Sequence, residues 1–167
     1  MTTLLAIDPG NTESGWVDID LVTRRPLRHG KTPNDELLQM LTDERSLSED
    51  YRVAIEMVAS YGMPVGADVF ETCVWIGRFL EATWARLGVP HPELIKRHPV
   101  KLHHCHNAGA KDSNIRQALV DRFAKGQPNY GKGTKANPGW FYGFHADVWQ
   151  AYALAVYAAD QAEGVAS

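Results

Sequence analysis

The sequence predicts an α/β fold, a mixed five-stranded sheet flanked by helices in which three antiparallel strands come first. Short apolar or alternating segments follow one another near the N-terminus, which predicts a strand meander. Further along, such segments alternate with amphipathic segments of helical period, which predicts strands separated by helices. The 167 residues are 44% hydrophobic and 22% charged, which is typical of a globular protein with one core. We therefore predict a single domain over residues 1–167.

Three strands are expected close to the N-terminus. The first is an apolar run that stops at Asp8, Pro9 and Gly10, which is typical of a buried strand followed by a turn. The second alternates in part, and the third is weaker. We predict these strands at residues 4–7, 15–22 and 27–31, and their short connections favour antiparallel pairing.

Strands and helices alternate in the rest of the chain. Two further strands are expected at residues 52–56 and 94–95. Asn34 is the expected N-cap of the first helix, because its side-chain oxygen can accept a hydrogen bond from a free backbone N–H. The second helix carries apolar positions at helical spacing along one side, at Phe70, Val74, Gly77 and Leu80. Helices are predicted at residues 34–47, 68–87, in a short turn after Pro99, at 111–124 and at 145–163.

Charge is distributed unevenly along the chain, although the net charge is only −3. Residues 91–136 carry 9 Lys and Arg against 3 Asp and Glu, whereas residues 1–90 carry 8 against 14. A basic segment on an acidic body is what a phosphate-binding face beside a carboxylate centre would produce. A solvated charged surface is the alternative interpretation.

The N-terminus has no basic segment before an apolar run, and no stretch approaches the roughly 20 apolar residues of a membrane span. We therefore expect a cytoplasmic protein. Its two cysteines, Cys73 and Cys105, are expected to be reduced thiols in that compartment.

Three acidic residues occupy special places. Asp8 and Glu56 each end an apolar strand, and Asp147 lies in the first turn of the last helix. If the two strands are neighbours, Asp8 and Glu56 are about 5 Å apart. Carboxylate oxygens suit Mg²⁺ or Mn²⁺, and two such ions could activate a water and stabilise a leaving oxygen at phosphorus. Each acid could instead be an ordinary turn or helix-cap residue.

Four segments together resemble the RuvC-type Holliday junction resolvases. Residues 7–16 are similar to the opening motif of that family, an apolar run, Asp-Pro-Gly and then a Gly that starts the next strand. Residues 53–56 resemble the second motif, an apolar strand ending in Glu. Residues 110–114 are similar to a lysine-bearing loop before a helix, and residues 147–155 to a final motif before an Ala-rich helix. The resemblance spans residues 4 to about 159, and the variant resembles those carried by bacteriophages.

The resemblance implies a ribonuclease-H-like fold and a metal-dependent endonuclease acting on branched DNA. It implies that Asp8, Glu56 and Asp147 bind Mg²⁺, for which Mn²⁺ could substitute, and that Lys111 lies near the cut. Paired nicks in a four-way junction need two active sites, so we predict a homodimer. The candidate interface is the helix at residues 68–87, through Phe70, Trp75, Phe79 and Trp84.

The last motif departs from the family pattern, because Gln150 stands where a final acid is expected. Its amide oxygen could still bind a metal ion, but more weakly than a carboxylate. His145 could supply the missing function by assisting metal binding or by protonating the leaving group, or it could simply face solvent. The departure leaves the number of catalytic ions open.

Basic residues of the charged segment are the expected DNA contacts, because Lys and Arg bind phosphate without reading sequence. Tyr61 could probe the branch point of the DNA. Trp140 and its aromatic neighbours could stack on exposed bases or anchor the last helix to the core. The predicted phosphate contacts are Lys101, Lys111, Arg116, Lys132 and Lys135.

Two other functions compete with the nuclease. An actin-like ATPase or sugar kinase also opens with an apolar strand followed by Asp and Gly, but it needs a second phosphate loop and a longer chain. A non-catalytic module of the same fold could bind DNA junctions without cutting them. Gln150 favours that alternative, whereas Asp8 and Glu56 weigh against it.

Overall fold

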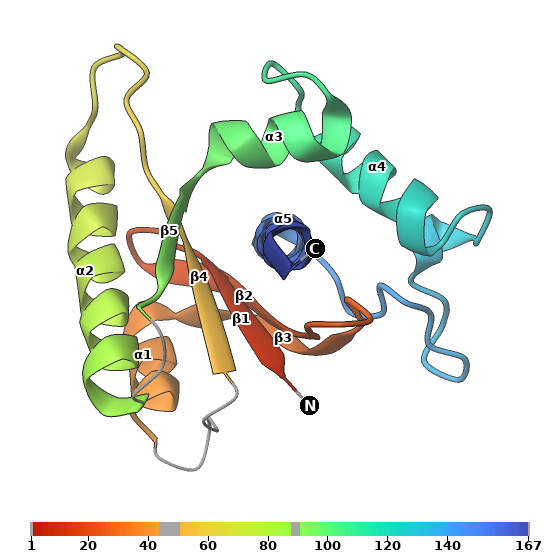
Figure 1. The fold of residues 1–167 in the computed structure, drawn as a ribbon, viewed down its shortest axis with the longest axis horizontal. Helices are drawn as coiled ribbons and strands as arrows, with labels where there is room; N and C mark the ends of the chain where they lie inside the picture. Colours follow the sequence, from red (N-terminus) through yellow and green to blue (C-terminus); the bar gives the residue numbers. More distant parts are fainter. Residues whose placement is uncertain (1, 44–50, 88–90, 167) are drawn as a thin grey trace.

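The computed structural model describes residues 2–43, 51–87 and 91–166, and it contains one five-stranded sheet of order β3-β2-β1-β4-β5 (Figure 1). The first three strands pair antiparallel, whereas β1 with β4 and β4 with β5 pair parallel. The predicted mixed sheet is therefore confirmed. Its strands are β1 (Thr3–Asp8), β2 (Glu13–Asp20), β3 (Pro26–Pro33), β4 (Tyr51–Met57) and β5 (Glu93–Lys96).

Helices cover both faces of the sheet. Figure 1 shows α1 and α2 on one face and the other three helices on the opposite face, with α5 lying between the sheet and α3 and α4. Among the described residues, no helix combines the length and the apolar character needed to cross a membrane. The helices are α1 (Asn34–Thr42), α2 (Ala67–Leu87), α3 (Arg97–Cys105), α4 (Asp112–Phe123) and α5 (Ala146–Ala166), with a 3₁₀ turn η1 (Asn129–Gly131).

The core consists of two clusters, one on each face of the sheet. On the α5 face, every residue from 148 to 156 of the helix is buried, because the sheet covers one side of α5 and α3 and α4 cover the others. The alanines of α5 let it lie close to the strands. On the opposite face, Ile7 and Ile55 pack against Leu37 of α1 and Phe79 of α2.

The structure corrects the predicted packing side of α2. Phe70 and Val74 are 63% and 62% exposed, whereas Thr72, Ile76, Phe79 and Thr83 form the buried side. Each buried threonine hydroxyl donates to the backbone carbonyl four residues earlier, which satisfies its polar atom inside the core. Apolar spacing alone therefore selected the wrong side of this helix.

Two helix boundaries also differ from the prediction. The first helix ends at Thr42, because Asp43 adopts an extended backbone, and residues 44–47 lie outside the described part of the chain. The short turn expected after Pro99 is instead the nine-residue helix α3. Pro99 lies in its first turn, where a residue without an N–H breaks no helical hydrogen bond.

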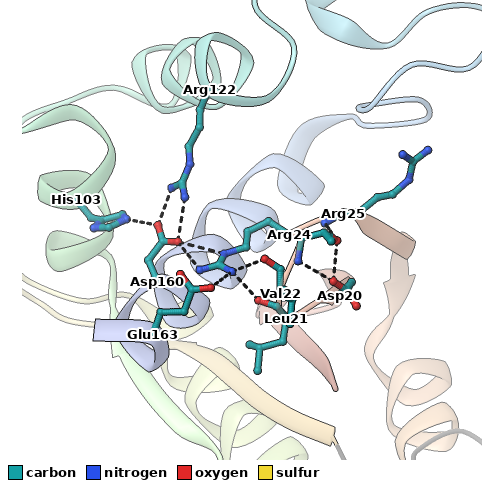
Figure 2. Close-up of polar contacts among 10 residues, drawn as sticks. Asp20, Leu21, Val22, Arg24, Arg25, His103, Arg122, Asp160 and Glu163 are labelled. Carbon is teal, nitrogen blue, oxygen red and sulfur yellow. Dashed lines mark hydrogen bonds and ion pairs between the residues drawn. The ribbon is translucent and has the colours of Figure 1, made fainter. Parts of the chain in front are cut away.

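An ion-pair hub around Asp160 ties the C-terminal half of α5 to the rest of the α5 face (Figure 2). Asp160 accepts hydrogen bonds from Arg24 in the β2–β3 turn at 3.0 Å, from His103 of α3 at 2.7 Å and from Arg122 of α4 at 2.6 Å. Arg24 is only 4% exposed and also donates to Glu163. Four separate segments therefore meet at one carboxylate.

Burial acts to raise the pKa of Asp160, but the hydrogen bonds from Arg122, His103 and Arg24 outweigh it, so this pKa lies well below its ordinary value. A lowered carboxyl pKa means that the charged form stabilises the fold above the pKa of the unfolded chain, about 3.9. This contribution is lost as the pH falls from there through the lower pKa of the folded protein.

We expect Asp160→Asn to lower the free energy of unfolding at pH 7 by about 3 kcal/mol, because it removes the less exposed of the two carboxylates that pair with the buried Arg24. The difference between variant and wild type should shrink as the pH falls below about 4. Urea unfolding at several pH values measures it. A difference that stays constant with pH would contradict the charged role of Asp160.

Candidate active site

The three predicted acids lie at one edge of the sheet. β1 and β4 are adjacent and parallel, with Ile7 opposite Ile55, so Asp8 and Glu56 end neighbouring strands at the same side. Asp147 starts α5 beside β2, where Gly15 is the partner of Asp8. A Cβ atom at Gly15 would lie 2.7 Å from the Cβ of Asp147. Only glycine therefore allows the first turn of α5 to come this close to the strand.

The loop after Asp8 is held by Asn34, for which the sequence predicted a different role. The Asn34 side chain donates to the Gly10 carbonyl at 2.9 Å and accepts from the Ser14 hydroxyl at 2.6 Å. Asn34 is 1% exposed and is the first residue of α1 rather than its N-cap, which is Pro33 and makes no side-chain cap. The predicted cap is therefore wrong, and the residue instead fixes the turn behind Asp8.

The acids repel one another. Burial raises the pKa of Asp8 well above its ordinary value, and the nearby charges of Glu56, Asp147 and Asp112 raise it further, against the opposing effect of Arg97. Burial also raises the pKa of Glu56, which Arg97 partly counteracts. Buried carboxylates with raised pKa values favour the binding of protons or of a cation.

Two basic side chains that the sequence analysis did not assign to the site already contact these acids. Arg97 pairs with Glu56 at 3.3 Å and with Asp112 at 2.6 Å, and Lys31 of β3 pairs with Asp147 at 2.9 Å. In this arrangement no group of three Asp, Glu, His or Cys side chains in the described residues is placed to hold a metal ion. The acids are close enough to affect the pKa of Asp8, although they do not form a metal-binding group in this arrangement. Arg97 and Lys31 neutralise two of them, Glu56 and Asp147.

The position of Arg97 carried a signal that sequence analysis could have used. It directly follows β5, which pairs parallel with β4 in the register Glu56 to Ile95. A residue just beyond the end of a parallel strand faces the same sheet edge as its neighbours. Lys31 had no such signal, because it lies within the edge strand β3, and β2 and β1 separate that strand from β4.

An open hollow of about 300 Å³ lies between the N-terminal ends of α4 and α5. Asp147 and Gln150 line it from α5, and Asp112 and Arg116 line it from α4. Gln150 is 9% exposed, and its amide makes no hydrogen bond to the described residues. An amide at this wall without a partner among the described residues can bind a polar ligand.

His145 lies just before α5 and is exposed. Its imidazole makes no hydrogen bond or ion pair with the acids in the part of the chain described. It lies near His29 of β3, whose pKa is lowered by burial and further by His145. The predicted assistance from His145 stays a prediction.

The predicted DNA contacts fall into two groups. Lys101 lines a smaller hollow of about 160 Å³ with Arg97 and Tyr61, and Lys111 is exposed immediately before α4. Lys101 therefore lies near Glu56, and Arg116 shares the α4–α5 hollow with Asp147. Lys132 and Lys135 lie on the loop after η1, farther from the acids along the chain.

The aromatic residues before α5 have mainly a packing role. Phe141 is fully buried, and Trp140 stacks on Phe123 of α4 with ring centroids 5.3 Å apart. The interpretation that they anchor α5 to the core is confirmed. Tyr142 is 42% exposed.

The strand order and the helices on both faces define a RuvC-like fold, of the ribonuclease-H-like class. The solved structures with this likeness include RuvC of Thermus thermophilus, with a TM-score of 0.65 and 18% identity over 98% of this chain and 97% of that one. The same protein in complex with a Holliday junction substrate matches with a TM-score of 0.64 and 17% identity, covering 98% and 96% of the two chains. No protein-family model and no curated protein matches the sequence. The likeness confirms the predicted fold class, whereas the expected bacteriophage-like character gains no support.

We expect Asp8→Asn to raise the melting temperature of the metal-free protein at pH 7 by about 2–4 °C, the shift that about 1 kcal/mol produces at this size. A raised carboxyl pKa means that the charged form destabilises the fold, and the neutral amide removes that cost. The gain should vanish below about pH 4, where Asp8 is protonated in both states. Thermal unfolding with chelator measures it.

Asp121→Asn is the matched control, because Asp121 is an exposed acid of α4 whose side chain accepts a hydrogen bond from Gln117 and forms no ion pair with the described residues. It should show no such gain. A lower melting temperature for Asp8→Asn at pH 7 would contradict the repulsion among the acids.

Proposed function

We propose that this protein is a metal-dependent endonuclease that hydrolyses phosphodiesters in branched DNA and resolves four-way junctions by paired nicks. The observation that carries the proposal is the group of mutually repelling carboxylates at the ends of β1, β4 and the start of α5. The likeness to a RuvC structure that holds a Holliday junction supports the choice of substrate. The expected cytoplasmic location remains a prediction.

Asp8, Glu56 and Asp147 would hold Mg²⁺ or Mn²⁺, because their oxygens are the ligands these ions prefer and their repulsion favours a cation. A bound divalent ion supplies a polarised water and stabilises the charge that develops on the leaving oxygen. Binding of such an ion requires Glu56 and Asp147 to exchange Arg97 and Lys31 for it.

The chain's own residues would bind and orient the DNA strand. Arg116, which lines the α4–α5 hollow, and Lys111, which precedes α4, would hold phosphates beside the acids, with Lys101 in the smaller hollow beside Arg97. The amide of Gln150 would orient a polar group inside the hollow. His145 remains our candidate for protonating the leaving group.

The deciding experiment is cleavage of a labelled four-way junction with Mg²⁺ or Mn²⁺, with linear duplex as comparison. We expect wild-type protein to cut the junction and Asp8→Asn to lose more than about a hundredfold in rate while it still binds, because metal-site changes of this kind reduce activity strongly. Asp121→Asn, the exposed control, should cut normally. Normal cutting by Asp8→Asn would overturn the assignment of the acids.

A second candidate function is junction binding without catalysis. Gln150 at the position of an expected acid favours it, as do the ion pairs that already occupy Glu56 and Asp147. In that case the wild type binds junctions and cuts under no divalent ion, and Gln150→Asp restores metal binding detectable by calorimetry. Nucleotide hydrolysis without DNA cleavage would instead favour the ATPase or kinase hypothesis.

We also propose a homodimer, with the exposed side of α2 as its interface. Phe70 is 63% exposed, Val74 is 62% exposed and Trp84 is 55% exposed, and positions spaced in this way share one side of a helix. Of the other residues predicted there, Phe79 is fully buried and Trp75 packs against it, so both contribute to the core of the monomer.

We expect Phe70→Glu to shift the protein from dimer to monomer in analytical ultracentrifugation, because it places a charge in the centre of an apolar interface. Val22→Glu is the control, since Val22 is 73% exposed in the β2–β3 turn, away from α2. A wild-type monomer at every concentration, or a dimer unaffected by Phe70→Glu, would contradict this interface.

A further inference from the structure

A second hollow, of about 470 Å³, lies far from the acids. Arg25 lines it from the β2–β3 turn, and Trp140, Gln127 and Asn137 line it from the segment between α4 and α5. The turn lies at the opposite end of the sheet from Asp8, because β2 ends beside the first residues of β1. This hollow is therefore separate from the candidate active site.

The positive charge of Arg25 has no acidic partner among the described residues, in contrast to its neighbour Arg24. Figure 2 shows that Arg24 points into the Asp160 hub, whereas the Arg25 side chain points away from it. The guanidinium carbon of Arg25 lies 5.6 Å from the centroid of the Trp140 ring. An unpaired guanidinium beside an aromatic ring is suited to bind an anion.

Trp140 is rigidly placed. Its ring stacks on Phe123 with an interplanar angle of 10°, and its indole N–H donates to the Tyr152 hydroxyl at 3.0 Å. The Tyr152 hydroxyl in turn donates to the Arg24 carbonyl. Because Phe123 and Arg25 already contact the ring, the group left for a ligand is the charge of Arg25 rather than a free stacking surface for a base.

A chain of side-chain and backbone contacts connects the two hollows. Arg116 lines the α4–α5 hollow, and its guanidinium carbon lies 4.6 Å from the ring centroid of Tyr130. Tyr130 is in η1, next to Gly131, and Lys132 follows. The Lys132 carbonyl accepts from the N–H of Gly139, which lines the distal hollow. Residues 113–146 contain five Lys and Arg and a single acid, Asp121.

We propose that the Arg25 hollow is a second phosphate-binding site that holds the backbone of a DNA arm leaving the active site along α4. The proposal rests on the proposed function. α4 has 12 residues, so it spans about 18 Å. That length equals about five base pairs at 3.4 Å each. The Arg25 hollow lies beyond the last residue of α4, at Gln127 and Trp140, so the distance is slightly longer than the helix. Arg25 therefore contacts a phosphate about five to seven base pairs from the branch point.

The test measures affinity for a four-way junction in chelator, where no cutting occurs, across a series of salt concentrations. One junction carries ordinary phosphates, and a second carries neutral methylphosphonates five to seven base pairs from the branch. We expect Arg25→Gln to reduce the salt slope of wild-type binding by about one per subunit. The neutral phosphates should weaken wild-type binding but have little further effect on Arg25→Gln.

Arg52→Gln is the matched control, because Arg52 is an exposed arginine of β4 with no ion pair among the described residues, and it lies neither on the proposed dimer side of α2 nor at the Arg25 hollow. It should keep the wild-type slope and the wild-type sensitivity to neutral phosphates. The distal site would be wrong if Arg25→Gln and wild type had equal salt slopes and lost the same affinity on the neutral junction. If the wild type still bound and cut the junction, this result would leave the proposed nuclease function intact. Absence of any junction binding by the wild type would overturn both proposals.

Discussion

The close packing of α5 on the centre of the sheet is the constraint on which the rest of the structure depends. Alanines along the helix and Gly15 in β2 leave space for this approach, and a single Cβ at Gly15 would collide with Asp147. The same packing decides where the first turn of the helix lies. Without it, Asp147 would have no reason to lie beside Asp8, and the acids at the ends of β1 and β4 would lack a third partner.

The two ends of α5 illustrate how surroundings decide the behaviour of identical groups. Near its start, Asp8 is surrounded by other carboxylates, and its pKa is raised. Near its end, Asp160 is surrounded by Arg24, Arg122 and His103, and its pKa is lowered. The charged form of Asp160 therefore stabilises the fold, whereas the charged form of Asp8 destabilises it. Such a separation of stable and strained charge clusters is typical of proteins whose functional site costs stability.

Arg97 and Lys31 partly neutralise the acid cluster. Each is close enough to pair with an acid, so the metal-free protein has partial neutralisation of its own. Asp112, which also pairs with Arg97, links this neutralisation to the start of α4. Arg97 therefore connects Glu56 at the end of β4 with the first turn of α4.

The sequence by itself determined the strands, their order of appearance and the acids at their ends, because apolar runs and the Asp-Pro-Gly turn are local patterns. The sequence placed Asp8 and Glu56 together on the condition that their strands are neighbours, and the parallel pairing of β1 with β4 meets that condition. Only the tertiary structure decided the pairing of Arg97 and Lys31 with the acids, the use of Asn34 to hold a turn, and the packing side of α2. These features depend on which side chains meet across segments distant in sequence, and a buried threonine or an asparagine can satisfy its hydrogen bonds in ways that no local pattern records.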